Sequence, residues 1–169
     1  MACNSLTSIL KSCSNNQGGI YSVWINETDN VTGTTVSTSA HTITGISATT
    51  DFTTFEFNRN VGSVVIDPKI DLINGSTYFE AKISLVFHRR ESAKSRALYI
   101  LGEGQRYLDI IFLDANGIYW YIDHAQLDGG AEETGTSKAD GSKYTVTFKA
   151  DMDTRPYAVD SAIVPGLIS

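Results

Sequence analysis

The dipeptide Asn74-Gly75 constrains the fold more than any other feature of the sequence. Both residues accept the positive φ of a type I′ turn, so the pair predicts a two-residue β-hairpin loop. In the register that such a loop sets, the apolar residues of the two arms meet on one face, as the pairs Ile70–Phe79, Ile66–Ile83 and Val64–Leu85. The opposite face brings together Asp71 with Tyr78, Lys69 with Glu80 and Asp67 with Lys82. A slip of one residue would exchange the two faces, so the pattern predicts a hairpin with one dry and one wet side.

The arms of this hairpin reach from Ser63 to His88, with no helix between residues 61 and 88. At ~3.3 Å per residue they are about 35–45 Å long. Pro68 lies inside the first arm and has no N–H to give to a ladder, which predicts a bulge or a gap in the pairing there.

Further elements follow from the same kind of pattern. Residues 20–25 predict a strand, and 89–101 a helix with one apolar face that ends at Gly102. That face contains Ala93, Ala97, Ile100 and Leu101. A cationic run, Arg89, Arg90, Lys94 and Arg96, is expected to be a solvated or subunit-contacting side of the helix rather than a nucleic-acid site.

Two more hairpins turn at Asn116-Gly117 and Asp140-Gly141. The first is expected to pair Ile111 with Ile122, Leu113 with Trp120, Asp109 with His124, Phe112 with Tyr121 and Asp114 with Tyr119. Because both of its faces carry apolar or aromatic groups, we expect it to be covered on both sides. The second ends in the strand 144–148, and the acidic, glycine-rich stretch 125–136 before it is expected to be an exposed loop.

Outside these elements, residues 1–19 form a polar N-terminal arm with at most one helical turn, and 20–169 are expected to be one β domain. The Thr- and Ser-rich stretch 28–54 predicts a loop with one or two edge strands. We expect the arm and this stretch to be ordered mainly by neighbouring subunits, because their apolar content is low. The apolar tail from Tyr157 to Ser169 needs a surface on which to lie, and Pro165 bars a long helix in it.

Charge and composition narrow the class of protein. A net charge of −6 repels nucleic-acid phosphates, which argues against a sequence-reading DNA or RNA binder. No apolar run approaches the ~20 residues that span a bilayer, and the N-terminus lacks the pattern of a signal peptide, so we expect no membrane anchor and no secretion. Cys3 and Cys13 match neither a zinc nor a redox spacing and are expected to be reduced thiols.

Catalytic and cofactor patterns are missing from the sequence. His41, His88 and His124 have no ligand spacing, so we expect no metal site. His124 opposite Asp109 has the form of a base with an orienting carboxylate, but no nucleophile motif accompanies it, and a structural cross-strand pair is the simpler interpretation. We therefore expect no catalytic residue, no metal and no cofactor, and the chain is not expected to be an enzyme.

The stretch from Phe55 to Leu167 resembles the tail-tube family of tailed bacteriophages, in particular versions from phages of gut Bacteroidales, including crAss-like phages. The resemblance is carried by the segments Phe55-Glu56-Phe57-Asn58-Arg59, the long hairpin, the helix Glu91–Leu101, Gln105-Arg106-Tyr107-Leu108, Asp114-Ala115-Asn116-Gly117, Lys138 to Thr147, and Pro156-Tyr157-Ala158-Val159-Asp160.

The resemblance implies a mainly β fold, a tail-tube-like β-sandwich or barrel with long hairpins and one flanking α-helix. It also implies that the hairpins of identical subunits join into a ring around a channel through which DNA passes without specific contacts. The partners would be adjacent phage tail or portal-proximal ring proteins, and the location the tail of a virion assembled in the host cytoplasm. The same fold serves as tube, tube terminator and head-to-tail ring, and the resemblance does not choose among them.

The charged face of the long hairpin is the candidate lining of that channel, and its residues are Asp67, Lys69, Asp71, Glu80 and Lys82. Its mixed charges keep a wall hydrated and offer DNA no continuous cationic track. Three alternatives remain open. In the first, the face is the ordinary solvent side of a monomeric sandwich. In the second, the chain is a carbohydrate-binding β-sandwich, such as a fibre or lectin-like module, in which Trp24, Trp120 and several tyrosines stack on sugars. The third, an enzyme on a jelly roll, is disfavoured because no catalytic acid pair is evident.

Overall fold

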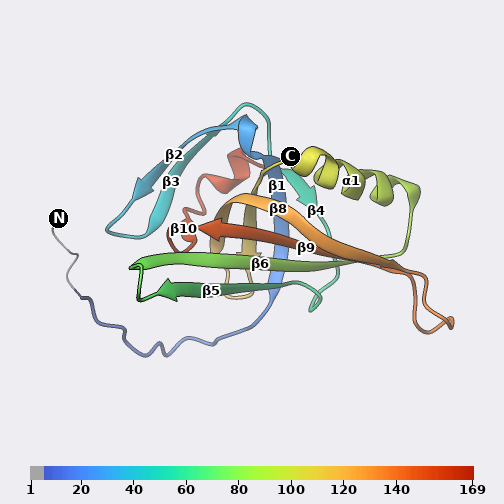
Figure 1. Ribbon diagram of the computed structural model, residues 1–169, viewed down its shortest axis with the longest axis horizontal. Coiled ribbons are helices and arrows are strands. Elements are labelled where there is room, and N and C mark those ends of the chain that lie inside the picture. Colours follow the sequence, from blue (N-terminus) through green and yellow to red (C-terminus); the bar gives the residue numbers. More distant parts are fainter. Residues whose placement is uncertain (1–5) are drawn as a thin grey trace.

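The computed structural model describes residues 6–169, which form a mainly β protein (Figure 1). Ten strands are present: β1 Ile20–Glu27, β2 Val31–Ser37, β3 Thr42–Ala48, β4 Thr53–Phe55, β5 Ser63–Asp71, β6 Ser76–His88, β7 Leu108–Asp114, β8 Tyr119–Glu133, β9 Lys143–Met152 and β10 Tyr157–Val159. Helix α1 spans Ser92–Gly102, and short 3₁₀ turns cover Thr28–Asn30, Glu103–Gln105 and Val164–Gly166.

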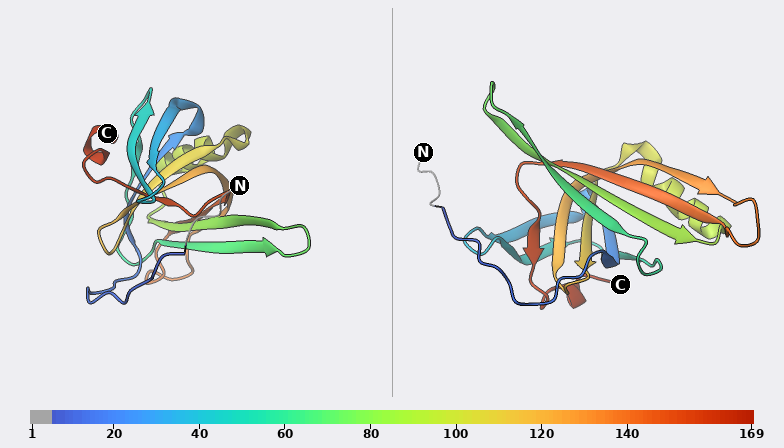
Figure 2. Two further views of the ribbon diagram at one scale, coloured as in Figure 1. Left: turned by 90° about the vertical axis from the view of Figure 1, so that its left-hand side faces the viewer. Right: turned by 90° about the horizontal axis from the view of Figure 1, so that it is seen from below.

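The strands form two layers that share one long strand, β8. One layer has the order β2-β3-β10-β8-β7-β1-β4, and the other has the order β5-β6-β9-β8. The first half of β8 pairs with β7 and β10, and its second half, from Gln126, pairs with β9. All pairings are antiparallel except that of β10 with β3, which makes the sheet mixed. Figure 2 shows the layers edge-on, with the β5–β6 hairpin running diagonally across the layer that contains β1 and β7.

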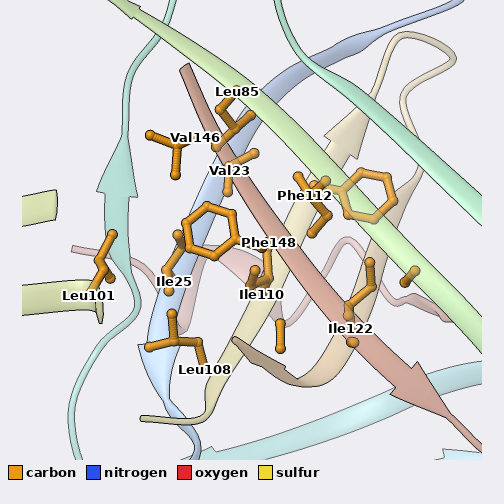
Figure 3. Close-up of a cluster of buried hydrophobic side chains, with 14 of the residues drawn as sticks. Val23, Ile25, Leu85, Leu101, Leu108, Ile110, Phe112, Ile122, Val146 and Phe148 are labelled. Atoms are coloured by element: carbon orange, nitrogen blue, oxygen red, sulfur yellow. The ribbon is translucent and has the colours of Figure 1, made fainter. Parts of the chain in front are cut away.

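The main hydrophobic core fills the space between the two layers. Strand β9 alternates strictly between buried and partly exposed residues, as expected for a strand with one face on a core. Side chains from β1, β6, β7, β8 and β9 converge there (Figure 3), and they include Val23, Leu85, Ile110, Ile122 and Phe148, all 1% exposed or less. The alternation of β6 and β9 thus turns one face of the hairpin layer inward and the other outward.

A second, smaller core lies on the far face of the layer that contains β1 and β7. It joins Trp24, Ile111 and Tyr121 to Val164 of the C-terminal tail and to Phe52. The tail is tied down by a parallel bridge between Phe52 and Ile168. The expectation that the apolar tail lies on a surface is confirmed, and the surface belongs to the same chain.

Helix α1 begins three residues later than expected, at Ser92, and ends at Gly102. The face that packs on the core contains Leu98 and Leu101 rather than the face expected from the sequence. Ala93, Ala97 and Ile100 are exposed, so only Leu101 of the expected set is buried. The helix covers only one open end of the main core. Buried Leu101 and partly buried Leu98 are enough to close that end, so the helix needs no continuous apolar stripe.

The long hairpin has the expected faces and a different register. Asp71 pairs with Ser76, so the loop contains four residues, 72–75, rather than two. Every pair is consequently shifted by two residues: Ile66 faces Ala81 and Asp67 faces Glu80. A shift of two keeps each side chain on its face, because side chains alternate with a period of two. No helix occurs between residues 61 and 88, as predicted.

The cause of the longer loop is the side chain of Asp71. Its Oδ1 accepts hydrogen bonds from the backbone N–H groups of Ile73 at 2.9 Å and Asn74 at 3.2 Å. The carboxylate thus starts the turn earlier than a type I′ loop would, which is common for Asp at this position. The bulge expected at Pro68 is absent, since pairing runs through it without a shift. Strand β5 pairs only with β6, and an edge strand tolerates proline.

The hairpin at Asn116-Gly117 differs from prediction by one residue over most of its length. Ile110 pairs with Ile122, and Phe112 with Trp120, whereas Leu108 still faces Ala125 as the predicted register requires. The carboxylate of Asp114 holds a four-residue loop by accepting from the N–H groups of Asn116 and Ile118, both at 2.9 Å. A bulge between Leu108 and Ile110 restores the register. Both faces are covered by cores, as predicted.

The stretch 125–136 was expected to be a loop, and most of it is the second half of β8. Its pairing with β9 continues to Glu133, so the hairpin loop contains only residues 134–142. Two glycines, Gly129 and Gly130, make this segment look loop-like in sequence. A Cβ atom on Gly130 would lie 2.6 Å from the carbonyl oxygen of Thr145, so the close approach of β9 requires glycine there.

A loop with one or two edge strands was expected for the Thr-rich stretch 28–54, and the structure places the edge strands β2 and β4 there together with the internal strand β3. β2 and β3 form a hairpin, β3 pairs with β10, and β4 pairs with β1. These partners lie within the chain, and ordering of the stretch by neighbouring subunits stays a prediction. Residues 6–19 contain no helix and are exposed, and Cys13 is an exposed free thiol. Cys3 lies outside the described residues.

Candidate functional site

The five candidate channel-lining residues share one face of the hairpin layer. Asp67, Lys69 and Asp71 alternate with the inward-facing residues of β5, and Glu80 and Lys82 do so on β6. The structure therefore brings them together on the side opposite the main core, as predicted. Strand β9 extends the face with Lys149 and Asp151, which were not among the predicted residues.

Charges on this face are arranged in rows that run across the strands. Asp67, Glu80 and Asp151 stand side by side on β5, β6 and β9. The next row holds Lys82 beside Lys149. Like charges are thus direct neighbours across the ladder, and opposite charges lie diagonally or along one strand. Lys69 and Glu80, and likewise Asp67 and Lys82, were expected to stand directly opposite each other, but the longer loop shifts the register by two residues and places each pair diagonally.

Glu80 is the centre of the ion-pair network on this face. Its carboxylate oxygens lie 3.0 Å from Nζ of Lys149, 3.3 Å from that of Lys82 and 4.0 Å from that of Lys69. Its side chain is only 12% exposed. The hydrogen bond from Lys149 lowers the pKa of Glu80, and the same bond raises the pKa of Lys149. Glu80 and Lys149 therefore stay ionised together, and Asp67 and Asp151 beside Glu80 balance the charges of the three lysines.

Both edges of the hairpin layer are unpaired within the described chain. β5 pairs only with β6, and the second half of β8 pairs only with β9. An unpaired strand exposes backbone N–H and C=O groups that can accept another strand. The layer thus has a strand without a backbone partner at each side, and helix α1 lies beside the β8 edge (Figure 1).

A buried carboxylate, Asp109, lies at the point where β8 passes from one layer to the other. It is 2% exposed, and it accepts hydrogen bonds from the hydroxyl groups of Tyr121 at 2.5 Å and Thr28 at 2.7 Å and from the backbone N–H of His124 at 3.1 Å. Burial, together with the neighbouring carboxylate, raises the pKa of Tyr121, so its hydroxyl keeps the proton that it donates. The three donors fix the bulge at which the strand changes partners.

The imidazole of His124 does not contact Asp109. Its Nδ1 lies 3.3 Å from Asp123, and the ring lies edge-on to Tyr107. The expected cross-strand pair is therefore formed by the backbone of His124, and the arrangement of a catalytic base with an orienting carboxylate is absent. His124 has a positive φ of 50°, a consequence of the bulge.

Only one of the two tryptophans is buried. Trp24 is 7% exposed in the second core. Trp120 packs on the main core, and its Nε1 donates to Asp114 at 2.8 Å. A sugar-stacking platform requires exposed rings, so Trp24 cannot contribute to one, whereas Trp120 is only partly buried and Tyr21, Tyr99 and Tyr107 are exposed.

The three histidines lie apart from one another. His41 contacts the carbonyl oxygens of Arg155 and Pro156, and His88 contacts Asn58. Among residues 6–169, no group of three or more His, Cys, Asp and Glu side chains is arranged to hold a metal ion. Within the same range, no helix is long and apolar enough to cross a membrane. No protein-family model matches the chain, and no curated protein matches it either.

Proposed function

We propose that this chain is a non-enzymatic structural subunit that assembles with identical copies into a ring, and that the ring belongs to the tail tube or head-to-tail channel of a tailed phage. The observation that carries the proposal is the hairpin layer itself. It has a strand without a backbone partner at each edge, one face on the core, and one face of mixed charge.

Free edges favour assembly over a monomeric state. A long unpaired strand such as β5 invites pairing with other chains, and closing a sheet into a barrel removes every edge. If β5 of one copy pairs with the second half of β8 of the next, the hairpin layers become one continuous wall. The inward faces then remain on the cores of the subunits, and the charged faces turn toward the enclosed space.

The charge pattern suits a wall past which DNA moves. The outward face of the layer carries four lysines against five carboxylates: Lys69, Lys82, Lys143 and Lys149, and Asp67, Asp71, Glu80, Glu133 and Asp151. The lysines that could contact phosphates are already engaged with carboxylates at Glu80. Affinity for DNA depends on free cationic contacts, so this face supports hydration and passage rather than binding.

The test combines assembly state with the accessibility of the charged face. Native mass spectrometry and negative-stain microscopy of the purified chain are expected to show closed rings or stacked tubes. In a background with Cys3→Ser and Cys13→Ser, a thiol is placed on the charged face by Lys82→Cys and, as a matched control, on the helix by Tyr99→Cys. Both positions are exposed in the single chain.

In assembled rings, the thiol at position 82 is expected to react with a small maleimide and to be protected from a maleimide carried on a large polyethylene glycol chain. The thiol at position 99 should react with both reagents. A chain that stays monomeric at all concentrations contradicts the ring. Rings in which both thiols react equally with the large reagent keep the ring and contradict the channel assignment.

A further inference from the structure

The tip of the β5–β6 hairpin is apolar and has no partner within the chain. Leu72 and Ile73 are 90% and 95% exposed, and Ile70, on the inward-facing side of β5, is 61% exposed. In Figure 2 (right) the tip projects clear of the other strands, so the core that covers Val64 and Ile66 does not reach it. Adjacent exposed aliphatic side chains at a projecting end are typical of a contact with another molecule.

The tip is also preorganised. The carboxylate of Asp71 accepts from the N–H groups of Ile73 and Asn74 and from the side-chain amide of Asn74 at 2.5 Å. These bonds lower the pKa of Asp71, so the tip carries a negative charge beside its two aliphatic side chains. A loop that is already fixed loses little conformational entropy when it binds.

An apolar hollow of about 370 Å³ lies at the open mouth between the two layers. Its apolar walls are formed by Ile20, Val64, Ile66, Phe112, Trp120 and Pro156. Its charged residues are Asp114 and Arg155. Asp114 is engaged by its own loop and by Trp120, whereas Arg155, which lies 5.0 Å above the ring of Phe79, forms no salt bridge with the described residues. The free charge of the hollow is therefore positive.

The tip cannot enter the hollow of its own chain. Ile66 lines the hollow, and Leu72 lies six residues farther along the same extended arm, at ~3.3 Å per residue about 20 Å away. The chain thus carries an apolar, negatively charged projection and an apolar, positively charged recess that only two different copies can bring together. A contact between two different surfaces of identical chains repeats from copy to copy.

We propose that the tip, with Leu72 and Ile73, inserts into the hollow of a second copy of this chain, where Asp71 approaches Arg155. The contact lies along the strand direction, whereas pairing of β5 with β8 of a neighbour lies across it. It is therefore a second interface beside the edge-to-edge pairing of the proposed ring, and its place in a stack of rings depends on that proposed function.

A photo-crosslinking experiment tests the contact directly. A benzophenone amino acid replaces Ile73 in isotope-labelled chain, which is mixed with an excess of unlabelled wild-type chain and irradiated. Cross-linked peptides are identified by mass spectrometry. We expect pairs of one labelled and one unlabelled peptide, in which the unlabelled one contains residues 63–66 or 112–120. The same probe at Tyr99, an exposed residue of α1, is the control and should not label these peptides.

Cross-links from position 73 only to the arm, residues 6–19, or only to peptides outside the hollow overturn the inference, and so does labelling confined to one chain. A second arm uses the double variant Leu72→Glu/Ile73→Glu with Tyr99→Glu/Ile100→Glu as the matched control. Both should keep the circular dichroism of the wild type, because all four side chains are exposed. Only the tip variant is expected to weaken self-association, with a dissociation constant at least tenfold higher in analytical ultracentrifugation.

The outcomes for the two proposals can be told apart. Closed rings without the cross-link to the hollow leave the proposed function standing and overturn the tip contact. Cross-links to the hollow in dimers or open chains, with no closed ring, support the tip contact and contradict the ring. Equal association of the tip variant and the control variant overturns the tip contact.

Discussion

The buried carboxylate of Asp109 gives the sharpest prediction about stability. Tyr121→Phe removes one donor from a charged acceptor that is almost fully buried. A hydrogen bond to a charged group contributes about 1.5–3 kcal/mol, so we expect the free energy of unfolding to fall by about that amount. Urea denaturation followed by tryptophan fluorescence measures it, because Trp120 and Trp24 lie in the two cores.

Asp109→Ala removes the acceptor instead and should cost more. It leaves three donors without a partner, the hydroxyl groups of Tyr121 and Thr28 and the backbone N–H of His124. At about 1–3 kcal/mol for each unsatisfied group, the loss is about 3–9 kcal/mol. That is a large share of the ~5–15 kcal/mol that stabilises a typical domain.

The sign of the coupling energy between Asp109→Ala and Tyr121→Phe separates the loss of a hydrogen bond from a general packing effect. In the Asp109→Ala background, Tyr121→Phe removes an unsatisfied hydroxyl and should be neutral or stabilising, although it is destabilising in the wild type. If Asp109→Ala does not fold, Asp109→Leu, which is similar in size and has no acceptor atom, provides the background. Asp123→Ala, at a partly exposed neighbouring carboxylate, is the control and should change stability by no more than about 0.5 kcal/mol. A loss from Tyr121→Phe that is equal in both backgrounds would refute the reasoning.

Three further predictions concern the hairpin layer. Gly130→Ala is expected to destabilise by about 1–3 kcal/mol, because its Cβ would clash with a carbonyl of β9, while Gly129→Ala, with no atom within 4 Å, should be nearly neutral in the same denaturation assay. Leu85→Ala, at a site with no exposure, should lower the free energy of unfolding by about 2–5 kcal/mol. Carbon-detected NMR titration should give Glu80 a pKa below 4.5 that rises toward this value in Lys149→Met. Because the pKa is depressed in the folded state, this carboxylate stabilises the fold above about pH 4.5 and ceases to do so as the pH falls through its folded-state pKa. An unchanged pKa of Glu80 in the variant would contradict the assigned cause.

The faces of the long hairpin could be predicted from the sequence, whereas its register could not. Alternation over two arms fixes which side chains are buried, and a shift of two residues does not alter it. The register depended on whether Asn74-Gly75 or Asp71 starts the turn. Local hydrogen bonds of the Asp71 carboxylate make Asp71 the start of the turn. The sequence Asp71 to Gly75 could equally well form a two-residue turn at Asn74-Gly75, so the sequence alone does not decide between them.

The hairpin at residues 116–117 illustrates a second limit. Both faces of β7 are buried, so a shift of one residue exchanges apolar for apolar side chains and leaves no mark in the sequence. The carboxylate of Asp114 and the bulge near Asp109 determine the actual pairing. Strands that alternate can reveal their register, and strands that are apolar throughout cannot.

Long-range pairing accounts for the part of the charged face that was missed. Lys149 and Asp151 join it only because β9 pairs with β6, a partner more than fifty residues away. The alternation of Tyr144, Val146 and Phe148 with polar residues was visible and would have placed Lys149 on a wet face. The glycines at 129 and 130 concealed the strand on the other side of β9.

The passage of β8 through both layers has a mechanical consequence. One covalent strand takes part in the ladder with β7 and in the ladder with β9, so the two layers cannot slide past each other unless hydrogen bonds in one of these ladders break. A pull along the strands of the hairpin layer loads the bonds between β6, β9 and β8 together, in shear, whereas a pull across the strands would open them one after another. The molecule is therefore expected to be stiff along the axis of its projecting hairpin and compliant at right angles to it.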